Sequence, residues 1–271
     1  GYLQSVVGKE AAVPGDTVVL RVDVALQRKL GEVLTSELAK LGSPAGVGII
    51  MDPRDGSLRA LVSLPDYNNN EFATGVTPER YQELVGDERK LFSNRAIAGQ
   101  YPSGSVIKPF VAAGGLADGV ITEHTSFDAP GEIRIGEFVF PDWKRHGVVD
   151  VKRAIAVSSN VFFYAVGGGY EKIRGLGIDR LNHYLELFGF GATTGIDLPG
   201  ESAGLVPTPA WKKEVKGEPW YLGDTYHAAI GQGDLLVTPI QLATATATIA
   251  NGGTIQTPHL LWKHQPVSTG V

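Results

Sequence analysis

An amphipathic segment followed at once by two short apolar runs is the feature that most constrains the fold. Asp23 is a good N-cap for a helix that runs to about Leu41, because apolar side chains then recur every three or four residues. The runs Ala45 to Met51 and Leu58 to Ser63 are joined by Asp-Pro-Arg-Asp-Gly, a turn composition typical of a β-hairpin. A helix beside an antiparallel pair predicts an α+β domain, with helices packed on an antiparallel sheet.

From Ser105 onward the pattern is largely helical. Thr238-Pro-Ile-Gln has the form of a capping box with proline at the first helical position, and its helix is expected to end at Asn251-Gly252. A short strand is expected over Thr17 to Val22, which is rich in β-branched residues. Three further helices are predicted, over Ser105 to Leu116, Asp150 to Val166 and Ile178 to Phe188.

The composition excludes several kinds of function. Lysine and arginine number 24 against 29 aspartate and glutamate, a net charge of -5, and no basic block stands out, which argues against nucleic-acid binding. The 271 residues include no cysteine, so thiolate catalysis, disulfides and cysteine metal sites are excluded. With 35 glycines and 16 prolines, much of the chain must form turns and shaped loops.

One uncharged stretch, residues 235–262, needs to be considered as a membrane span. It is broken by Pro239, Gly252 and Pro258 and is rich in threonine, glutamine and asparagine. A spanning helix needs about 20 mostly apolar residues, so a buried helix with its flanking loops is the better interpretation. Because no signal peptide opens the chain and its first residue is not methionine, we expect a piece of a longer protein.

The segment from Tyr101 to Phe110 holds the first candidates for chemistry. Gly104 allows a tight turn, Ser105 then lies at the start of a helix, and Lys108 follows one turn later on the same face. A neutral lysine amine can take the proton of a serine that attacks a carbonyl, provided that the lysine pKa is lowered. Backbone N–H groups at the helix start can stabilise the oxyanion that forms. The same pattern also occurs as an ordinary helix start with an exposed lysine.

A second polar group, Ser158-Ser159-Asn160, lies about 50 residues further on between apolar helical segments. In isolation it is typical of residues that cap backbone groups at a helix end. In a cleft beside the first group, the Ser158 hydroxyl and the Asn160 amide are suited to relaying a proton and holding a substrate amide.

Together these two groups resemble the first two active-site motifs of class B penicillin-binding proteins. The first motif is Asn94-Arg95-Ala96 followed by Gly99 to Pro109, and the second is Ser158 to Asn160 followed by Val161 to Tyr164. The similarity extends over nearly the whole chain and is greatest to the elongation-type branch of the class. Other matching segments carry no chemistry: Phe188 to Gly191, Thr194 to Glu201, Gly204 to Pro207, Trp211-Lys212, Trp220-Tyr221, Gly223 to Thr225, Ile230 to Gly233, Thr238 to Ala243 and Ala250 to Gly253.

The resemblance implies a fold and an activity. The fold is the α+β type of penicillin-binding protein transpeptidases and serine β-lactamases, with helices packed on an antiparallel sheet. The activity is that of a peptidoglycan D,D-transpeptidase, in which Ser105 attacks the D-Ala–D-Ala bond of a stem peptide and Lys108 acts as base. Ser158 and Asn160 would relay protons and position the substrate, and β-lactams would acylate Ser105. No cofactor and no metal are implied.

The resemblance also implies partners and a location. Peptidoglycan stem peptides and β-lactams are the expected ligands, and a glycosyltransferase and other membrane proteins of the elongation complex are the expected protein partners. The domain is expected on the periplasmic, extracytoplasmic face of the inner membrane, anchored by a helix outside this chain. Residues 1–15 are interpreted as a linker from an upstream region, and residues 16–271 as the transpeptidase domain.

The sequence departs from the family at the third motif, Lys-Thr-Gly or Lys-Ser-Gly. The nearest string, Ser268-Thr269-Gly270, lacks the lysine, so we expect the domain to be truncated at its C-terminus, without the inner strands that bear this motif. The loss would remove one oxyanion N–H and the cation that binds the substrate carboxylate. A second, smaller departure is Ser103, where the family more often has proline, and little consequence is expected.

The missing motif leaves alternatives open. One is a penicillin-binding sensor or a degenerate paralogue, which is acylated without turnover. Within the enzymes, the alternative is a D,D-carboxypeptidase or a class D-like β-lactamase, in which water takes the acyl group, although the glycine-rich family segments argue against a β-lactamase.

Asp142, His146 and Asp150 form the one arrangement that suggests a metal. Carboxylates four residues on either side of a histidine supply ligand types that zinc accepts. However, no second histidine lies nearby, and Lys144 and Arg145 lie between the first two residues. A solvated loop near the second motif is therefore the preferred interpretation.

Overall fold

The first helix and the hairpin form where the sequence predicts them. The computed structural model describes residues 15–73 and 75–262. Helix α1 (Val24–Leu41) begins after Asp23, whose carboxylate accepts hydrogen bonds from backbone N–H groups of the first turn. Strands β1 (Gly46–Met51) and β2 (Leu58–Leu64) pair antiparallel, with an irregularity in the register near the end of β1.

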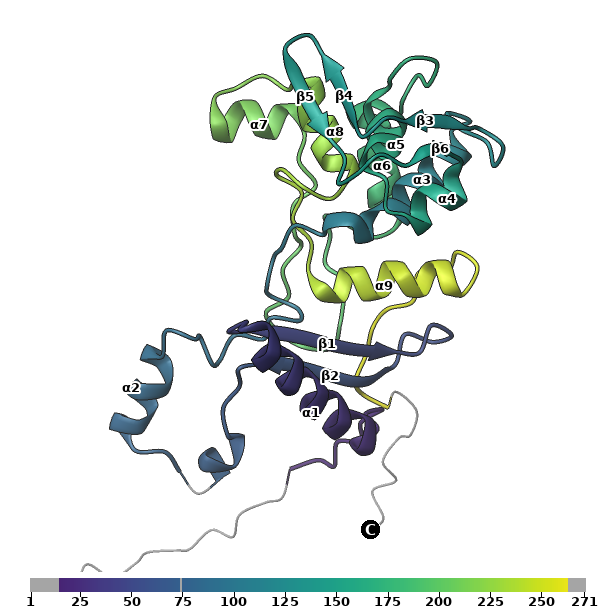
Figure 1. The fold of residues 1–271 in the computed structure, drawn as a ribbon. Helices are drawn as coiled ribbons and strands as arrows, with labels where there is room; N and C mark the ends of the chain where they lie inside the picture. Colours follow the sequence, from purple (N-terminus) through teal and green to yellow (C-terminus); the bar gives the residue numbers. More distant parts are fainter. Residues whose placement is uncertain (1–14, 74, 263–271) are drawn as a thin grey trace, which may run out of the picture.

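Helices cover both faces of this two-stranded sheet (Figure 1). On one face, Gly48 of β1 allows α1 to approach closely, since a β-carbon there would lie 2.9 Å from the Leu30 side chain. Helix α9 (Pro239–Ala250) packs on the other face of β1. It has the predicted capping box, in which Thr238 and Gln241 each accept a backbone N–H of the other.

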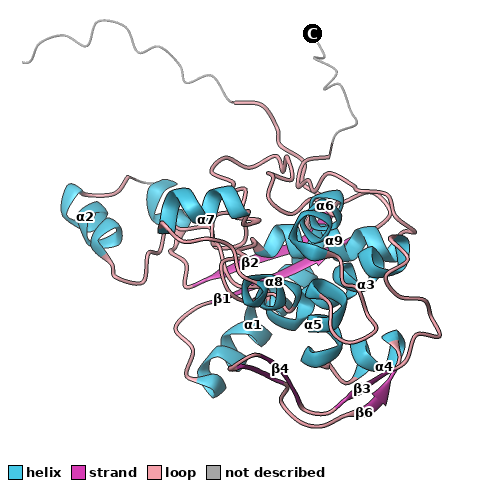
Figure 2. Ribbon diagram, turned by 90° about the horizontal axis from the view of Figure 1, so that it is seen from above, coloured by secondary structure: helices cyan, strands magenta, loops and turns pink. Residues whose placement is uncertain are grey.

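The second part of the molecule consists of helices around a large apolar core (Figures 1 and 2). Its central helix is α5 (Asn160–Gly168), which contacts α3 and α8, and α3 contacts α6. Two short antiparallel pairs, β3 with β6 and β4 with β5, lie at its edge. The elements are, in chain order, the 3-10 helix η2 (Gly104–Ile107), α3 (Lys108–Ala117), β3 (Phe127–Ala129), β4 (Glu132–Ile135), β5 (Phe138–Pro141), β6 (Gly147–Val149), α4 (Val151–Ala156), α5, α6 (Gly177–Leu187), α7 (Pro209–Lys216) and α8 (Leu222–Ala229).

Two predicted elements are wrong. The single helix expected over Asp150 to Val166 is two helices, α4 and α5, because Ser158 has a left-handed φ of 54° that no α-helix can contain. The strand expected over Thr17 to Val22 is only a single bridge from Leu20 to Leu261. Leu20 is exposed, and a β-rich segment without a neighbouring strand on which to pack does not form a regular strand.

Another segment forms elements that were not predicted. The 3-10 helix η1 (Asn69–Ala73) and α2 (Pro78–Gly86) lie within residues 65–95, a long polar stretch, and α2 protrudes from the rest of the molecule (Figure 1). Tyr67, Phe72 and Phe92 hold this segment together by edge-to-face contacts, with ring centroids 4.6 to 6.1 Å apart.

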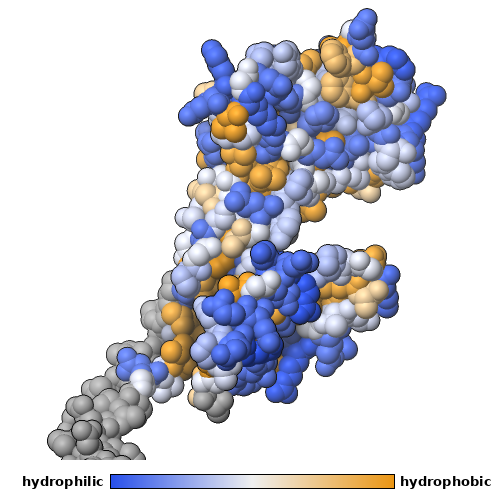
Figure 3. All heavy atoms as spheres, turned by 90° about the vertical axis from the view of Figure 1, so that its left-hand side faces the viewer, coloured by the Kyte–Doolittle hydropathy of each residue, from blue (hydrophilic) through white to orange (hydrophobic). Residues whose placement is uncertain are grey.

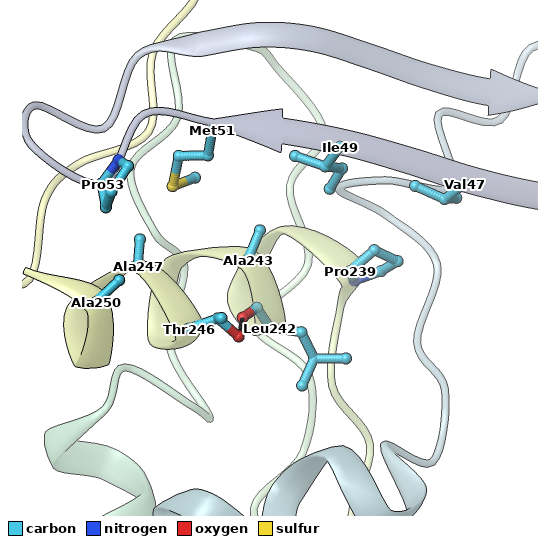
Figure 4. Close-up of a pocket in the computed structure, with 10 residues that line it drawn as sticks. All are labelled: Val47, Ile49, Met51, Pro53, Pro239, Leu242, Ala243, Thr246, Ala247 and Ala250. Atoms are coloured by element: carbon cyan, nitrogen blue, oxygen red, sulfur yellow. Dashed lines mark hydrogen bonds between the residues drawn. The ribbon is translucent and has the colours of Figure 1, made fainter. Parts of the chain in front are cut away.

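The surface is hollowed between the hairpin part and the helical part (Figure 3). Between them, β1 and α9 line an apolar cavity of about 430 Å³ that is open to solvent and toward which alternate residues of β1 point (Figure 4). Thr246 is its one polar lining residue, and its hydroxyl donates to the Leu242 carbonyl oxygen, so the lining of this cavity includes no titratable group for acid–base chemistry. No helix in the described part of the chain combines the length and the apolar character that crossing a membrane requires.

Candidate active site

Ser105 and Lys108 lie on consecutive helical turns, as the sequence predicts. Ser105 belongs to η2, which runs directly into α3 at Lys108. The Ser105 side chain is exposed, whereas Lys108 has a relative exposure of only 1%. An ordinary helix start with an exposed lysine is therefore the wrong interpretation of this segment.

The turn before Ser105 is supported by a segment far away in the sequence. The Gly104 N–H donates to the carbonyl oxygen of Gly231 at 2.8 Å. Gly231 has a φ of 73°, and a β-carbon there would overlap the Gly104 carbonyl oxygen and the Ser103 hydroxyl. Position 231 thus needs glycine both for its backbone conformation and for this close approach.

The second motif surrounds the amine of Lys108. Its Nζ lies 2.8 Å from the Ser158 carbonyl oxygen, 3.1 Å from Ser158 Oγ and 2.7 Å from Asn160 Oδ1. The Phe163 ring lies beside it, with its centroid 5.7 Å from Nζ. Of the predicted site residues, the structure therefore brings Lys108, Ser158 and Asn160 into contact. Ser105 is three residues before the lysine, and its hydroxyl makes no hydrogen bond within the described residues.

Burial lowers the pKa of Lys108 to about 8, while the negative charge of Asp142 acts in the opposite direction. A minor but useful fraction of the amine is then unprotonated near neutral pH. A neutral amine has two N–H donors and one lone pair, so the Ser158 hydroxyl can donate to Nζ while the two other oxygens still accept. The arrangement can therefore accept a proton at Lys108 and pass one through Ser158.

The break between α4 and α5 gives the second motif its geometry. Ser158 in the left-handed region costs roughly 1 kcal/mol, which the surrounding contacts must offset. Ser159 is the N-cap of α5, and its hydroxyl accepts the Phe162 N–H at 3.3 Å. Its two neighbours, Ser158 and Asn160, are the residues that contact Lys108. The helix-capping interpretation thus holds for Ser159 but not for Ser158 and Asn160.

The loop near the second motif is exposed over Trp143 to Arg145, as predicted, but the side chains of Asp142 and His146 at its two ends are buried and not solvated. Their side chains are 0% and 1% exposed, and His146 Nε2 lies 3.5 Å from Asp142 Oδ1. The loop is anchored on α5, because Asp142 Oδ2 accepts hydrogen bonds from Ser159 Oγ at 2.8 Å and from the Val161 N–H at 3.0 Å. Asp150 lies apart, as the N-cap of α4. Among residues 15–73 and 75–262, no cluster of three or more histidine and carboxylate side chains could hold a metal.

Two supporting residues, Asp142 and Gly231, were not predicted as parts of the site. Each acts through a partner distant in the sequence, and such pairs leave no periodic signal. The only available hint for Gly231 was its place in the Ile230-to-Gly233 segment that matched the family without chemistry of its own. The string Ser268 to Gly270 and residues 1–14 of the expected linker lie outside the described residues.

Comparison with known proteins decides the family. Residues 46–270 match the family described as the penicillin binding protein transpeptidase domain. The chain belongs to this family. The transpeptidase domain is 39% identical over 254 residues to the peptidoglycan D,D-transpeptidase MrdA of Haemophilus influenzae, which covers 92% of this chain and 37% of that protein. It is 39% identical over 251 residues to MrdA of Escherichia coli strain K12, covering 91% of this chain and 38% of the relative. The chain thus spans well under half the length of these relatives.

Solved structures confirm the fold class of the transpeptidase domain. The complex between penicillin-binding protein 2 and MreC from Helicobacter pylori matches with a TM-score of 0.82 and 34% identity, over 92% of this chain and 44% of that chain. Penicillin-binding protein 2 of Pseudomonas aeruginosa in complex with WCK 5153 matches with a TM-score of 0.80 and 35% identity, over 95% of this chain and 55% of that chain. Both belong to the elongation-type branch to which the sequence was expected to be most similar.

Proposed function

We propose that this chain is the catalytic domain of a peptidoglycan D,D-transpeptidase, which cross-links cell-wall stem peptides through an acyl-enzyme on Ser105. The observation that best supports this activity is the buried Lys108 amine, which the second motif holds one turn after an exposed serine. Relatives of the chain carry the name peptidoglycan D,D-transpeptidase.

In the acylation step, Ser105 Oγ attacks the carbonyl carbon of the penultimate D-Ala, and the neutral amine of Lys108 takes the hydroxyl proton. The backbone N–H of Ser105, in the first turn of η2, is suited to stabilising the oxyanion of the tetrahedral intermediate, since the N–H groups of Gly104 and Lys108 already donate to the carbonyl oxygens of Gly231 and Ser105. When the C–N bond breaks, the leaving D-Ala amine takes a proton from Lys108 by way of the Ser158 hydroxyl. The result is an ester on Ser105 and free D-Ala.

In the transfer step, the amine of a neighbouring stem peptide attacks the ester carbonyl. Lys108 takes the proton of this amine, the new amide bond forms as the ester C–O bond breaks, and Lys108 returns the proton to Ser105 Oγ, which restores the hydroxyl. Because Asn160 Oδ1 accepts from Lys108, the amide nitrogen of Asn160 is the part that can donate to a substrate carbonyl. A β-lactam would follow the same first step and remain as an ester, since no leaving group departs.

The location and the partners belong to the same proposal. We place the domain outside the cytoplasm, where its peptide substrate is found, with stem peptides and β-lactams as ligands. A solved relative was determined in complex with MreC, and another belongs to a study of polymerization and crosslinking by a peptidoglycan synthase complex. A glycosyltransferase and other membrane proteins of the elongation complex are the corresponding partners proposed for this chain.

Transfer of the acyl group to an amine tests the proposal. The chain is incubated with a D-Ala–D-Ala-terminated stem peptide and a second stem peptide that supplies only the acceptor amine, and products are followed by liquid chromatography with mass detection. We expect a cross-linked product that has lost one D-Ala and that disappears after treatment with penicillin. Release of D-Ala into water alone would instead support a carboxypeptidase. A stable penicillin adduct without any D-Ala release would support the sensor or degenerate paralogue.

A further inference from the structure

The loop between β5 and β6 carries a buried carboxylate that the acyl-transfer steps do not use. The Asp142 side chain is fully buried, with an exposure of 0%. Burying a charge is costly unless hydrogen bonds compensate it. Asp142 accepts three: from Ser159 Oγ at 2.8 Å and the Val161 N–H at 3.0 Å with Oδ2, and from the Trp143 N–H at 2.8 Å with Oδ1. These three hydrogen bonds fix the position of the Asp142 carboxylate.

The partners of Asp142 lie at the start of α5. Ser159 is the N-cap of this helix, and Val161 belongs to its first turn. A carboxylate at a helix N-terminus satisfies free N–H groups and interacts favourably with the helix dipole. Asp142 therefore fixes the position and the direction of the first turn of α5, which begins with Asn160.

Two further bonds hold the same loop to the second motif. The Trp143 indole N–H donates to the Val157 carbonyl oxygen at 3.2 Å, one residue before Ser158. The Tyr164 hydroxyl donates to the Pro141 carbonyl oxygen at 3.2 Å, further along α5. Ser158, in its strained left-handed conformation, is thus held on both sides by three consecutive residues, Pro141 at the end of β5 and Asp142 and Trp143 at the start of the loop.

The Asp142 carboxylate also has an electrostatic effect on Lys108, because its negative charge favours the protonated amine. On the same loop, His146 Nε2 lies 3.5 Å from the Asp142 carboxylate. On α5, burial and the charge of Asp142 raise the pKa of Tyr164 to about 12, which keeps the phenol neutral. The other elements that pack on α3 are α4 and α6, and none of their charged or titratable side chains is hydrogen bonded to Lys108. These side chains are Lys152, Arg153, Asp179, Arg180, His183, Tyr184 and Glu186.

We propose that Asp142 is a positioning residue of this domain, which holds Ser158 and Asn160 against the base of the reaction. The inference rests on the proposed acylation of Ser105 and adds a residue that touches neither the nucleophile nor the substrate. Removal of the carboxylate then has two separable effects. Loss of the anchor displaces the second motif and slows acylation at every pH. Loss of the negative charge makes protonated Lys108 less favourable, so the lysine titrates at lower pH.

Three variants separate these effects. Asp142→Asn keeps the shape but removes the charge, and Asp142→Ala removes both. Asp150→Asn is the matched control, because Asp150 is also a helix N-cap in the adjacent α4 but does not contact the second motif, and asparagine caps about as well as aspartate. The titration of Lys108 is followed by NMR on chain labelled with ¹³C at lysine Cε, and acylation by a penicillin is followed by intact mass.

We expect Lys108 to titrate at lower pH in Asp142→Asn than in the wild type and to be unchanged in Asp150→Asn. At a pH well above the lysine midpoint, we expect acylation of Asp142→Ala to be about 10- to 100-fold slower than in the wild type, the range that a displaced catalytic group causes. Wild-type titration and wild-type acylation in both Asp142 variants would overturn the inference. A wild-type chain that penicillin does not acylate would contradict the proposed function instead, and the NMR titration would still decide the role of Asp142.

Discussion

Replacing Lys108 with methionine is expected to slow the acylation of Ser105 by penicillin about 100- to 10,000-fold, the usual contribution of a positioned general base. Methionine fills nearly the same buried volume, so the apolar surroundings of Lys108 are kept. What is lost is the only amine in contact with Ser158 and Asn160 within the described residues. The second-order rate constant of adduct formation, measured by intact mass over time, gives the effect.

A second buried lysine provides the control for this variant. Lys212 of α7 is 4% exposed, and its Nζ lies 2.7 Å from Asp224 Oδ2, a pairing that raises its pKa. Lys212→Met breaks this pair and should lower the melting temperature, but the folded protein should be acylated within about threefold of the wild-type rate, since it keeps its general base. Acylation of Lys108→Met at such a near-wild-type rate would contradict the assignment of Lys108 as the base.

Gly231→Ala is expected to destabilise the domain by about 2 to 4 kcal/mol, from left-handed strain and overpacking together. The same change should slow acylation by about 100-fold, because the added methyl group pushes on the turn that carries Ser105. Urea unfolding gives the free energy of unfolding, and the rate of penicillin adduct formation gives the kinetic effect.

Gly217 is the matched control for the backbone strain. Its φ is also 73°, but no atom lies within 4 Å of a β-carbon built there. Gly217→Ala should therefore cost only about 1 kcal/mol and leave acylation unchanged. Equal effects of the two glycine variants would show that the contact between Gly231 and the Ser105 turn has no importance for the site.

Local signals explain which parts of the fold could be predicted. The N-cap at Asp23 and the capping box that begins at Thr238 are formed by residues three or fewer positions apart, and both are confirmed. The hairpin depends on one short turn, and it also forms where expected. In the same way, Lys108 follows Ser105 by one helical turn, so their placement on consecutive turns could be predicted from the spacing alone.

Features that depend on distant contacts could not be predicted in this way. The apolar sequence around Ser158 is typical of one continuous helix. The interruption of the helix there is explained only by the hydrogen bonds from the loop after β5. Asp142 was predicted to lie in a solvated loop, in part because Lys144 and Arg145 follow it, but its side chain is buried against the start of α5. The segment from Thr17 to Val22 has strand composition, but within the described residues it forms only a single bridge, from Leu20 to Leu261. The contact of Lys108 with the second motif, 50 residues away, was predicted from the family resemblance alone.

Intact-mass spectrometry of the chain after incubation with a penicillin, with Ser105→Ala in parallel, tests the central claim most directly. We predict a stable adduct of one penicilloyl group on the wild-type chain and none on the variant. The same result would show that the residues described here form a reactive site without a Lys-Thr-Gly motif. An adduct of equal yield on Ser105→Ala would contradict the assignment of Ser105 as the nucleophile, and a folded wild-type chain without any adduct would contradict the proposed acylation itself.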